Sequence, residues 1–320
     1  MKGLTDIPGI RVGHASDYDA ITGCTAILCE GGAVAGGDIR GFATGTEEFD
    51  VLSPLHLTTH VHGVVFAGGS AFGLEAVSGV RKFLEHKGVG FDTGHARVPI
   101  VPGAILYDLG IGKSHVRPNR EMGEAAAAAA NDGPVKEGNV GAGTGASVGK
   151  VFGMAQAMKS GVGSYTVTLG GANSPLRVAA LAVVNAVGDV IDYRSGKILA
   201  GTRKSRESRE FLNSADAIKM GARAGFKNGN TTLVVVATNV GLTKVQATRL
   251  AQISQHGVVR TISPVNTLSD GDIAIALSAG KERADFNALG IAAAEAVAEA
   301  ILRAVRSAGS LGGLPGLKAD

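Results

Sequence analysis

Asn230 and Thr231 are the neighbouring residues whose types and position most invite chemistry. They lie in the segment 228–244, at the start of the apolar, β-branched run 233–237, which is typical of a strand buried on both faces. Attack of the Thr231 hydroxyl on the Asn230 carbonyl would form an ester, and its hydrolysis would leave Thr231 as a new N-terminus. The free α-amine, with a reference pKa of about 7.7 to 8.0, would then accept the proton of its own hydroxyl. A plain turn at 228–230 followed by a strand fits the same residues.

A glycine-rich segment, residues 139–149, precedes Lys150 and offers a second chemical feature. It lacks the P-loop pattern, because Thr144 stands where the first glycine belongs and Val151 stands where Ser or Thr would bind magnesium. It also lacks the dinucleotide pattern, since the last glycine comes one residue too late. We therefore expect no nucleotide cofactor. The loop can instead line a pocket and bring the Lys150 cation to a nucleophile or an oxyanion.

Asp270 and Asp272 flank a glycine immediately before an apolar run. Two carboxylates around a glycine usually form a turn. The functional alternative is that they hold an ammonium group, which would be the new α-amine of Thr231, the side chain of Lys150 or an amine of the substrate. The sequence leaves these three alternatives open.

Two other familiar kinds of site find little support. His56, His60 and His62 have a spacing possible for metal ligands, but the adjacent glutamate of a zinc-protease helix is missing, so we expect no metal. No serine stands in a Gly-x-Ser-x-Gly motif, which weakens an α/β-hydrolase interpretation.

Composition limits the fold and the partners. Of the 320 residues, 45% are apolar but only 4% aromatic, so a core must be built from Ala, Val, Ile and Leu in closely packed layers. The net charge of +3 is too balanced for a nucleic-acid or anionic-membrane footprint, and we exclude both as main partners. The N-terminal residues lack a signal-peptide pattern, which favours a cytoplasmic protein. Cys24 and Cys29, an odd number of residues apart, are expected as buried thiols on opposite faces of a strand.

Apolar periodicity predicts strands and helices in mixed order along the chain. Buried strands are expected at 61–66, 181–184, 233–237 and 272–277, with strand-like patterns over 10–40 and 99–109. Helices are expected at 71–86, 121–131, 242–256 and 285–308, with Ser70 and Thr243 as N-caps of the first and third. Residues 203–210 are expected as an exposed connector, and the chain from Gly309 as a loose tail. Sheets covered by helices on the outside fit this pattern best.

Several short motifs in a fixed order carry a resemblance that extends over nearly the whole chain. They are Ile10–His14, Thr22–Thr25, Asp38–Arg40, Gly45–Glu47, Gly68–Gly73, Val98–Pro102, Gly143–Gly145 and Asn230–Thr232. Together they resemble the self-processing aminopeptidase/esterase family, which includes L-aminopeptidase/D-esterases, β-peptidyl aminopeptidases and nylon-oligomer endoamidases. The resemblance implies an α/β fold of four layers, αββα, shared with ornithine acetyltransferases. Residues 42–44, Phe-Ala-Thr, depart from the Gly-Ala-Pro-like turn expected there. The departure affects the expected shape of that loop more than the expected chemistry.

The resemblance also implies roles for individual residues. A single catalytic domain, 1–320, would be cut into an α chain, 1–230, and a β chain, 231–320. Thr231 would be the N-terminal nucleophile of the β chain, in the branch of the family that has threonine after asparagine. Asn185 would be an oxyanion donor, Lys150 and Tyr107 would be electrostatic and hydrogen-bond partners, and Asp270 and Asp272 would orient the Thr231 amine.

The sequence and the resemblance together favour an amidohydrolase that acts through an acyl-enzyme on Thr231, without cofactor or metal. Its substrates would be short peptides, small amides or esters, and the resemblance implies a homo-oligomer of αβ units. Two alternatives remain open: an acyltransferase that uses the same nucleophile, and an uncut relative that only binds a ligand.

Overall fold

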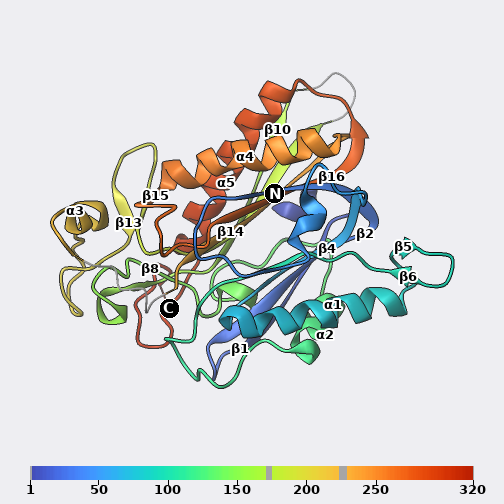
Figure 1. Cartoon of the computed structure of the whole chain (residues 1–320). Helices are drawn as coiled ribbons and strands as arrows, with labels where there is room; N and C mark the ends of the chain where they lie inside the picture. The colour runs from blue at the N-terminus through green and yellow to red at the C-terminus, as the bar shows by residue number, and fades with distance from the viewer. Residues whose placement is uncertain (1, 171–174, 223–228, 320) are drawn as a thin grey trace.

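The structure is a computed structural model that describes residues 2–170, 175–222 and 229–319. Asn228, the first residue of the expected Asn-Gly-Asn turn, lies outside the described residues. Helices α4 and α5 lie on one side of the molecule and α1 and α2 on the other, with the long strands between them (Figure 1). The helices are α1 (Glu75–His86), α2 (Arg120–Ala128), α3 (Ser214–Lys219), α4 (Lys244–Thr261) and α5 (Phe286–Arg306).

The strands form one large mixed sheet and three small ones within the described residues. The large sheet has nine strands in the order β10-β11-β14-β16-β2-β4-β7-β3, with β1 paired to β2. The pairs β14–β16 and β4–β7 are parallel, and the other pairs are antiparallel. The strands are β1 (Arg11–Asp17), β2 (Thr22–Ile39), β3 (Thr46–Glu47), β4 (His60–Ala67), β5 (Phe91–Asp92), β6 (Arg97–Val98), β7 (Gly103–Ile105), β8 (Ser147–Val148), β9 (Met158–Lys159), β10 (Val162–Leu169), β11 (Leu176–Asn185), β12 (Asp189–Ile191), β13 (Ile198–Ala200), β14 (Thr231–Val240), β15 (Ile262–Ser263) and β16 (Ile273–Glu282).

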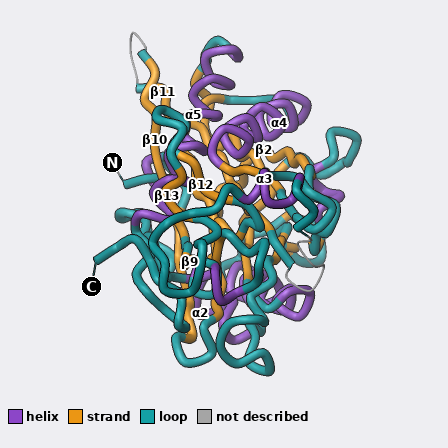
Figure 2. The backbone as a smooth tube through the Cα atoms, turned by 90° about the vertical axis from the view of Figure 1, so that its left-hand side faces the viewer, coloured by secondary structure: helices purple, strands orange, loops and turns teal. Residues whose placement is uncertain are grey.

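The long strands are buried on both faces, and alternate side chains along them enter different apolar clusters. In β11, Ala180 and Ala182 pack with α4 and α5, whereas Leu181 and Val183 enter an inner cluster. Phe66 of β4 joins the same inner cluster, which draws on strands, loops and short 3-10 helices. The outer faces of β2 and β4 pack against α1 and α2 instead. Seen from the side, the strands run between the α4–α5 pair and α2 (Figure 2).

The expected elements are largely present, and the four buried strands extend beyond the predicted runs at one or both ends. The runs 61–66, 181–184, 233–237 and 272–277 fall in β4, β11, β14 and β16, although Asp272 itself precedes its strand. The helices expected at 121–131, 242–256 and 285–308 are α2, α4 and α5, and Thr243 caps α4 through a complete capping box. Cys24 and Cys29 lie in different apolar clusters, and burial raises the pKa of each thiol to about 12.

Two expectations about short segments are wrong. Ser70 does not cap a helix. It is the first residue of the 3-10 helix η3 (Ser70–Leu74), has a left-handed φ of 55°, and its N–H donates to the Leu106 carbonyl. Helix α1 therefore begins at Glu75, several residues later than expected. The strand-like pattern at 99–109 yields only β7, since Leu106 and the residues after it turn away to form the loop that carries Tyr107.

The connector 203–210 is mostly exposed, as expected, whereas the chain after Gly309 differs from expectation. Arg203 is buried within the connector 203–210, and its guanidinium donates to the Ala155 carbonyl at 2.8 Å, although much of the remaining connector is exposed. The chain after Gly309 is not loose in its described part. Leu314 is buried, and the Pro315 carbonyl accepts a hydrogen bond from the Lys159 N–H at 2.9 Å.

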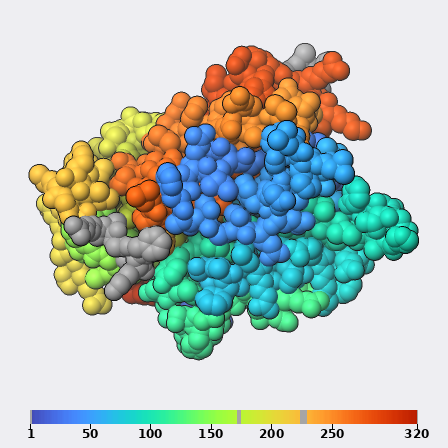
Figure 3. Space-filling view, viewed as in Figure 1, coloured from blue at the N-terminus to red at the C-terminus, as the bar shows by residue number. Residues whose placement is uncertain are grey.

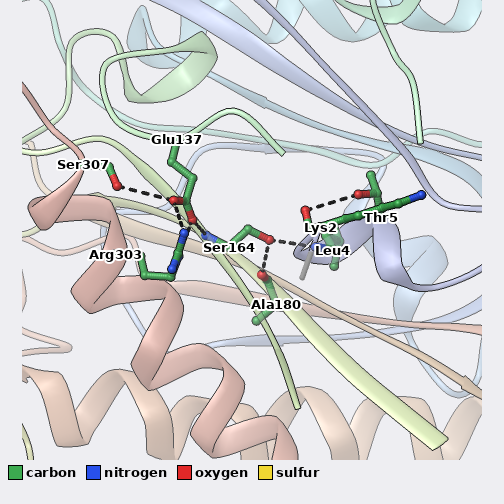
Figure 4. A network of polar contacts seen from close by, with 8 residues as sticks. All are labelled: Lys2, Leu4, Thr5, Glu137, Ser164, Ala180, Arg303 and Ser307. Carbon is green, nitrogen blue, oxygen red and sulfur yellow. Dashed lines mark hydrogen bonds and ion pairs between the residues drawn. The ribbon is translucent and has the colours of Figure 1, made fainter. Parts of the chain in front are cut away.

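A polar network ties the N-terminal segment to the last helix (Figure 4). The Ser164 hydroxyl accepts the Leu4 N–H at 2.8 Å and donates to the Ala180 carbonyl at 2.7 Å. Glu137 accepts the Ser164 N–H and two hydrogen bonds from Arg303 of α5, at 2.7 and 2.6 Å. The network therefore joins residues that lie before and after position 230.

The early and late parts of the chain also meet on the surface. Figure 3 shows N-terminal residues (blue) lying against the segment that contains α4 (orange). Lys244, the first residue of α4, donates to the Val51 carbonyl at 2.6 Å and also to the Thr58 carbonyl. Among the described residues, no helix is both long and apolar enough to cross a membrane.

Candidate active site

Several of the expected site residues lie at the adjoining ends of three neighbouring strands of the large sheet, β11, β14 and β16. Thr231 is the first residue of β14, and Asn185, the last residue of β11, is its direct cross-strand partner. Asn230 pairs with Asp270 just before β16, which runs parallel to β14. Parallel strands begin at the same edge of a sheet, and an antiparallel neighbour ends there. Residues distant in the sequence are thereby brought together.

Asn230 and Thr231, the two residues of the proposed cleavage site, are both buried. The Thr231 hydroxyl donates to the Asn230 carbonyl oxygen at 2.5 Å, and the Gly271 N–H donates to the same oxygen at 2.7 Å. The Thr231 hydroxyl oxygen therefore lies beside the carbonyl of its own preceding peptide bond. A backbone donor also lies where negative charge would develop on that carbonyl oxygen.

Asp270 and Asp272 enclose this peptide bond from the β16 side, and both carboxyl groups are buried. One Asp272 oxygen accepts the Thr232 N–H at 2.6 Å and the other accepts the Asn266 N–H at 3.1 Å. Burial, and then the neighbouring Asp270 charge, raise the pKa of Asp272 to about 7. Burial also raises the pKa of Asp270, whose Oδ1 atom has no hydrogen-bond partner among the described residues. An acceptor is therefore available for an additional donor.

The loop 41–43 overlaps residues 42–44, which depart from the expected turn, and it holds the main chain of both aspartates. The Ala43 N–H donates to the Asp270 carbonyl at 2.8 Å, and the Gly41 N–H donates to the Asp272 carbonyl at 3.1 Å.

Lys150 and Asn185 form a buried pair on the other side of Thr231. The Lys150 ammonium donates to the Asn185 side-chain oxygen and to its main-chain carbonyl, each at 2.8 Å. Burial lowers the pKa of Lys150 to about 7, although nearby carboxylates oppose this shift. The Asn185 side-chain nitrogen donates to the carbonyls of Tyr107 at 3.1 Å and Gly229 at 3.4 Å. The donors on the Asn230 carbonyl are thus the Gly271 N–H and the Thr231 hydroxyl, whereas the Asn185 amide donates to the carbonyls of Tyr107 and Gly229.

Tyr107 lies in the loop after β7 and borders a small cavity beside the Lys150 side chain. A β-carbon on Gly229 would lie only 2.6 Å from the Tyr107 Cβ, so the chain leading to Asn230 passes directly over the tyrosine. The cavity has about 10 Å³ of water-accessible space, roughly what one water molecule needs. It is lined by Tyr107, Asp108, Gly110, Ile111, Gly145, Ser147, Lys150, Met154 and Gly229. No space of substrate size adjoins Lys150 in this cavity.

Four residues of the site were not singled out from the sequence. Gly271 was part of a turn pattern, and Ser147 was part of the glycine-rich loop, where its N–H donates to the Asn185 Oδ1 atom at 3.1 Å. Asp108 and Lys159 are isolated charged residues in otherwise uncharged surroundings, and both are buried. A charged residue within an apolar and glycine-rich stretch is the signal that could have identified the last two.

The three histidines considered as metal ligands have other partners. The His62 ring accepts the Ile100 N–H at 3.1 Å, and the His56 ring accepts the Thr58 N–H at 3.1 Å. The His60 ring forms a hydrogen bond with the Thr59 hydroxyl at 2.8 Å.

Comparisons with known proteins identify peptidases and amide hydrolases as relatives of this chain. The sequence matches peptidase family S58 over residues 2–319. An uncharacterized aminopeptidase of Mycobacterium leprae (strain TN) is 37% identical, over 98% of this chain and 93% of the relative. A 6-aminohexanoate-oligomer endohydrolase of Kocuria sp. (strain KY2) is 30% identical, over 94% of this chain and 85% of the relative.

Solved structures show the same fold. The L-aminopeptidase D-Ala-esterase/amidase of Ochrobactrum anthropi, described as a new variant among the Ntn hydrolase fold, has a TM-score of 0.72 at 19% identity, over 98% of this chain and 88% of that one. A β-aminopeptidase of Burkholderia sp. has a TM-score of 0.70 at 24% identity, over 99% of this chain and 91% of that one. The sequence match over nearly its full length shows that the chain belongs to peptidase family S58.

Proposed function

We propose that this protein is a self-processing amidohydrolase that cuts its own chain after Asn230 and then uses Thr231 as an N-terminal nucleophile. The observation that carries the proposal is the position of the Thr231 hydroxyl, 2.5 Å from the Asn230 carbonyl oxygen, which also accepts the Gly271 N–H. The nucleophile, the carbonyl it would attack and a donor for the resulting oxyanion are thus adjacent in the uncut chain.

The self-cleavage would proceed in two balanced steps. In the first, the Thr231 oxygen attacks the Asn230 carbonyl carbon, the carbon–nitrogen bond breaks, and the proton lost by the hydroxyl goes to the departing α-amine. The product is an ester between Asn230 and the Thr231 side chain. In the second, water hydrolyses this ester, which leaves a carboxylate on Asn230 and a free amine and hydroxyl on Thr231. The free amine can then activate the hydroxyl toward a substrate acyl group.

The surrounding ionisable groups suit proton transfer near neutral pH. The pKa of Lys150 is lowered to about 7 and that of Asp272 is raised to about 7, so each exchanges a proton readily in that range. We assign Lys150 to the handling of the hydroxyl proton and Asp270 and Asp272 to holding the new α-amine. Asn185 and Tyr107 would complete the site after cleavage, when the carbonyl of Asn230 is replaced by that of a substrate.

The substrate class rests on the relatives. Because relatives carry the names aminopeptidase and 6-aminohexanoate-oligomer endohydrolase, we propose short peptides, small amides or esters as substrates. Because Asn230 and Thr231 are both buried, the cut end at Asn230 would have to move before such a substrate reaches Thr231. On this proposal, a single catalytic domain becomes chains 1–230 and 231–320, and the two halves of the large sheet correspond to the inner layers of an αββα fold.

The decisive experiment is the intact mass of freshly purified protein, followed by N-terminal sequencing. Wild-type protein should give fragments 1–230 and 231–320, the second beginning Thr-Thr-Leu-Val. Thr231→Ala should remain a single chain without amidase activity, whereas Thr232→Ala, the matched control at the next position, should still be cut. Cleavage before residue 231 in Thr231→Ala would refute the proposal. Release of free acid without an added amine acceptor would distinguish hydrolysis from acyl transfer.

A further inference from the structure

Lys159 is a fully buried lysine that the proposed chemistry does not use. Its ammonium donates to three main-chain carbonyls, those of Gly143 at 3.4 Å, Ala146 at 2.5 Å and Ser160 at 2.9 Å. No carboxylate lies within ion-pair distance of it among the described residues. Burial of a charge is costly unless its donors are satisfied. A lysine retained there without an ion pair therefore invites an explanation.

The Ala146 carbonyl connects Lys159 to the site through a single peptide group. That carbonyl and the Ser147 N–H belong to the same peptide plane. The Ser147 N–H donates to the Asn185 Oδ1 atom at 3.1 Å, and the same Oδ1 atom accepts the Lys150 ammonium at 2.8 Å. Strands β8 and β9 hold this arrangement, because Ser147 and Lys159 are direct cross-strand partners. Hydrogen bonds joined in this way polarise and orient one another.

We propose that Lys159 is a positioning residue whose ammonium fixes the Ala146–Ser147 peptide and, through it, Asn185 and Lys150. This inference rests on the proposed function, since it gives Lys150 and Asn185 their place in the reaction. Between the Lys159 ammonium and the Lys150 ammonium lie only the Ala146–Ser147 peptide group and the Asn185 side-chain amide. Loss of the ammonium would leave the Ala146 carbonyl with only the Ser160 N–H, at 3.1 Å, and would free the Ser147 N–H to shift.

The charged groups around Lys150 predict in which direction its pKa should move when one of them is removed. Asp270 and Asp272 face Lys150 from the residues before β16, Asp108 faces it from the loop after β7, and Lys159 faces it from β9. When charged, Lys159 lowers the pKa of Lys150, and the Asp108 charge raises it. Burial lowers the pKa of Lys159 itself to about 7, so its charge acts on Lys150 mainly at neutral pH and below. Asp108 is itself held by the Thr22 hydroxyl and the Gly69 N–H, each at 2.7 Å. Removing either charge should therefore move the Lys150 titration, in opposite directions.

The experiment measures the titration of the Lys150 side chain by NMR in the Thr231→Ala background, which keeps the chain uncut. Lys159→Met should raise the pKa of Lys150 by at least about 0.5 units, because a positive neighbour is lost, and Asp108→Asn should lower it. With Thr231 restored, Lys159→Met should slow self-cleavage at least about tenfold and move its pH profile in the same upward direction. Lys159→Arg, which keeps the charge, should leave the Lys150 titration near its original position.

Lys244 offers a matched control. It is a buried lysine whose ammonium likewise donates to main-chain carbonyls, here those of Val51, His56 and Thr58, away from the site. Lys244→Met should leave the Lys150 titration unchanged. An unchanged Lys150 pKa in Lys159→Met, with cleavage within about twofold of wild type, would overturn the inference. If wild-type protein never cleaves before Thr231, the proposed function fails, while the Lys150 titration still decides the role of Lys159.

Discussion

At the scale of single residues, the site depends on a glycine as much as on charged groups. A β-carbon on Gly271 would lie 2.9 Å from the Thr231 hydroxyl oxygen and 2.7 Å from the Ala43 carbonyl oxygen. Both contacts are too close for an undisturbed site, so the residue between the two aspartates has to be glycine for the hydroxyl to keep its place. The Asp-Gly-Asp segment therefore packs directly against Thr231, the residue to which we assign the reaction.

The environment of Lys150 predicts how the proposed self-cleavage should depend on pH. Burial lowers the pKa of Lys150 to about 7 and raises that of Asp272 to about 7, so both groups gain protons as the pH falls below neutrality. If neutral Lys150 accepts the hydroxyl proton, cleavage should be about tenfold slower at pH 6 than on its plateau above pH 8. The measurement is a time course of fragment appearance on denaturing gels between pH 5.5 and 9, starting from freshly refolded precursor.

A shift of the pH 6 sample to pH 8 should restore the fast rate, which would separate titration of the site from acid unfolding. A rate that does not change between pH 6 and 8 would contradict the assignment of Lys150.

At the scale of elements, the site exists because strand ends converge. Thr231 begins β14, Asn185 ends β11, and Asp270 and Asp272 precede β16, and these three strands are neighbours in the middle of the sheet. Helices α4 and α5 cover this part of the sheet on its outer face. Helix α4 lies between β14 and β16 in the sequence, so its first turn helps to set the path of the chain between the two halves of the site.

The N-terminus of α4 gives a test of stability. The Thr243 side chain accepts the Gln246 N–H, and the Gln246 side chain accepts the Thr243 N–H, which completes a capping box. Thr243→Ala should lower the free energy of unfolding by about 1 kcal/mol, because helix N–H groups lose their partners. Chemical denaturation in the uncut Thr231→Ala background would measure it.

Thr248→Ala, in the same helix, is the control. The Thr248 hydroxyl donates back to the Lys244 carbonyl within the helix, an interaction that contributes little to stability. A smaller loss for Thr243→Ala than for Thr248→Ala would show that the capping box does not stabilise α4.

At the scale of the whole molecule, the proposed cut would fall at the start of a central strand. Strand β14 is hydrogen-bonded to β11 on one side and to β16 on the other, and all ten of its residues are buried. Further contacts join the two parts, including the Glu137–Arg303 ion pair and the bonds from Lys244 to the segment around Val51. The two chains would therefore share one core.

Cleaved protein should accordingly stay together under native conditions. Fragments 1–230 and 231–320 should elute together in size-exclusion chromatography, at no less than the mass of one complete αβ unit, and should separate only in denaturant. The reason is that separation would expose the apolar faces of β11, β14 and β16 to water. Elution of the two fragments as separate native species would show that β14 is not held as a central strand.

The sequence by itself determined much of this protein. Long β-branched runs, alanine-rich helical patterns and the Thr243 cap predicted most of the main elements, because these patterns depend on local periodicity and local hydrogen bonds. The order of motifs indicated the family, and that assignment is confirmed. The roles given to Thr231, Lys150, Asn185, Tyr107, Asp270 and Asp272 remain predictions, although the structure gathers these residues.

Only the tertiary structure decided which groups meet. The pairing of Asn185 with Thr231, the Gly271 N–H on the Asn230 carbonyl and the path from Lys159 through the Ala146–Ser147 peptide all join residues far apart in the chain. Such contacts are set by strand order and register, which no local pattern encodes. For the same reason the pKa shifts of Lys150 and Asp272 could not be foreseen, since they arise from burial within the folded protein.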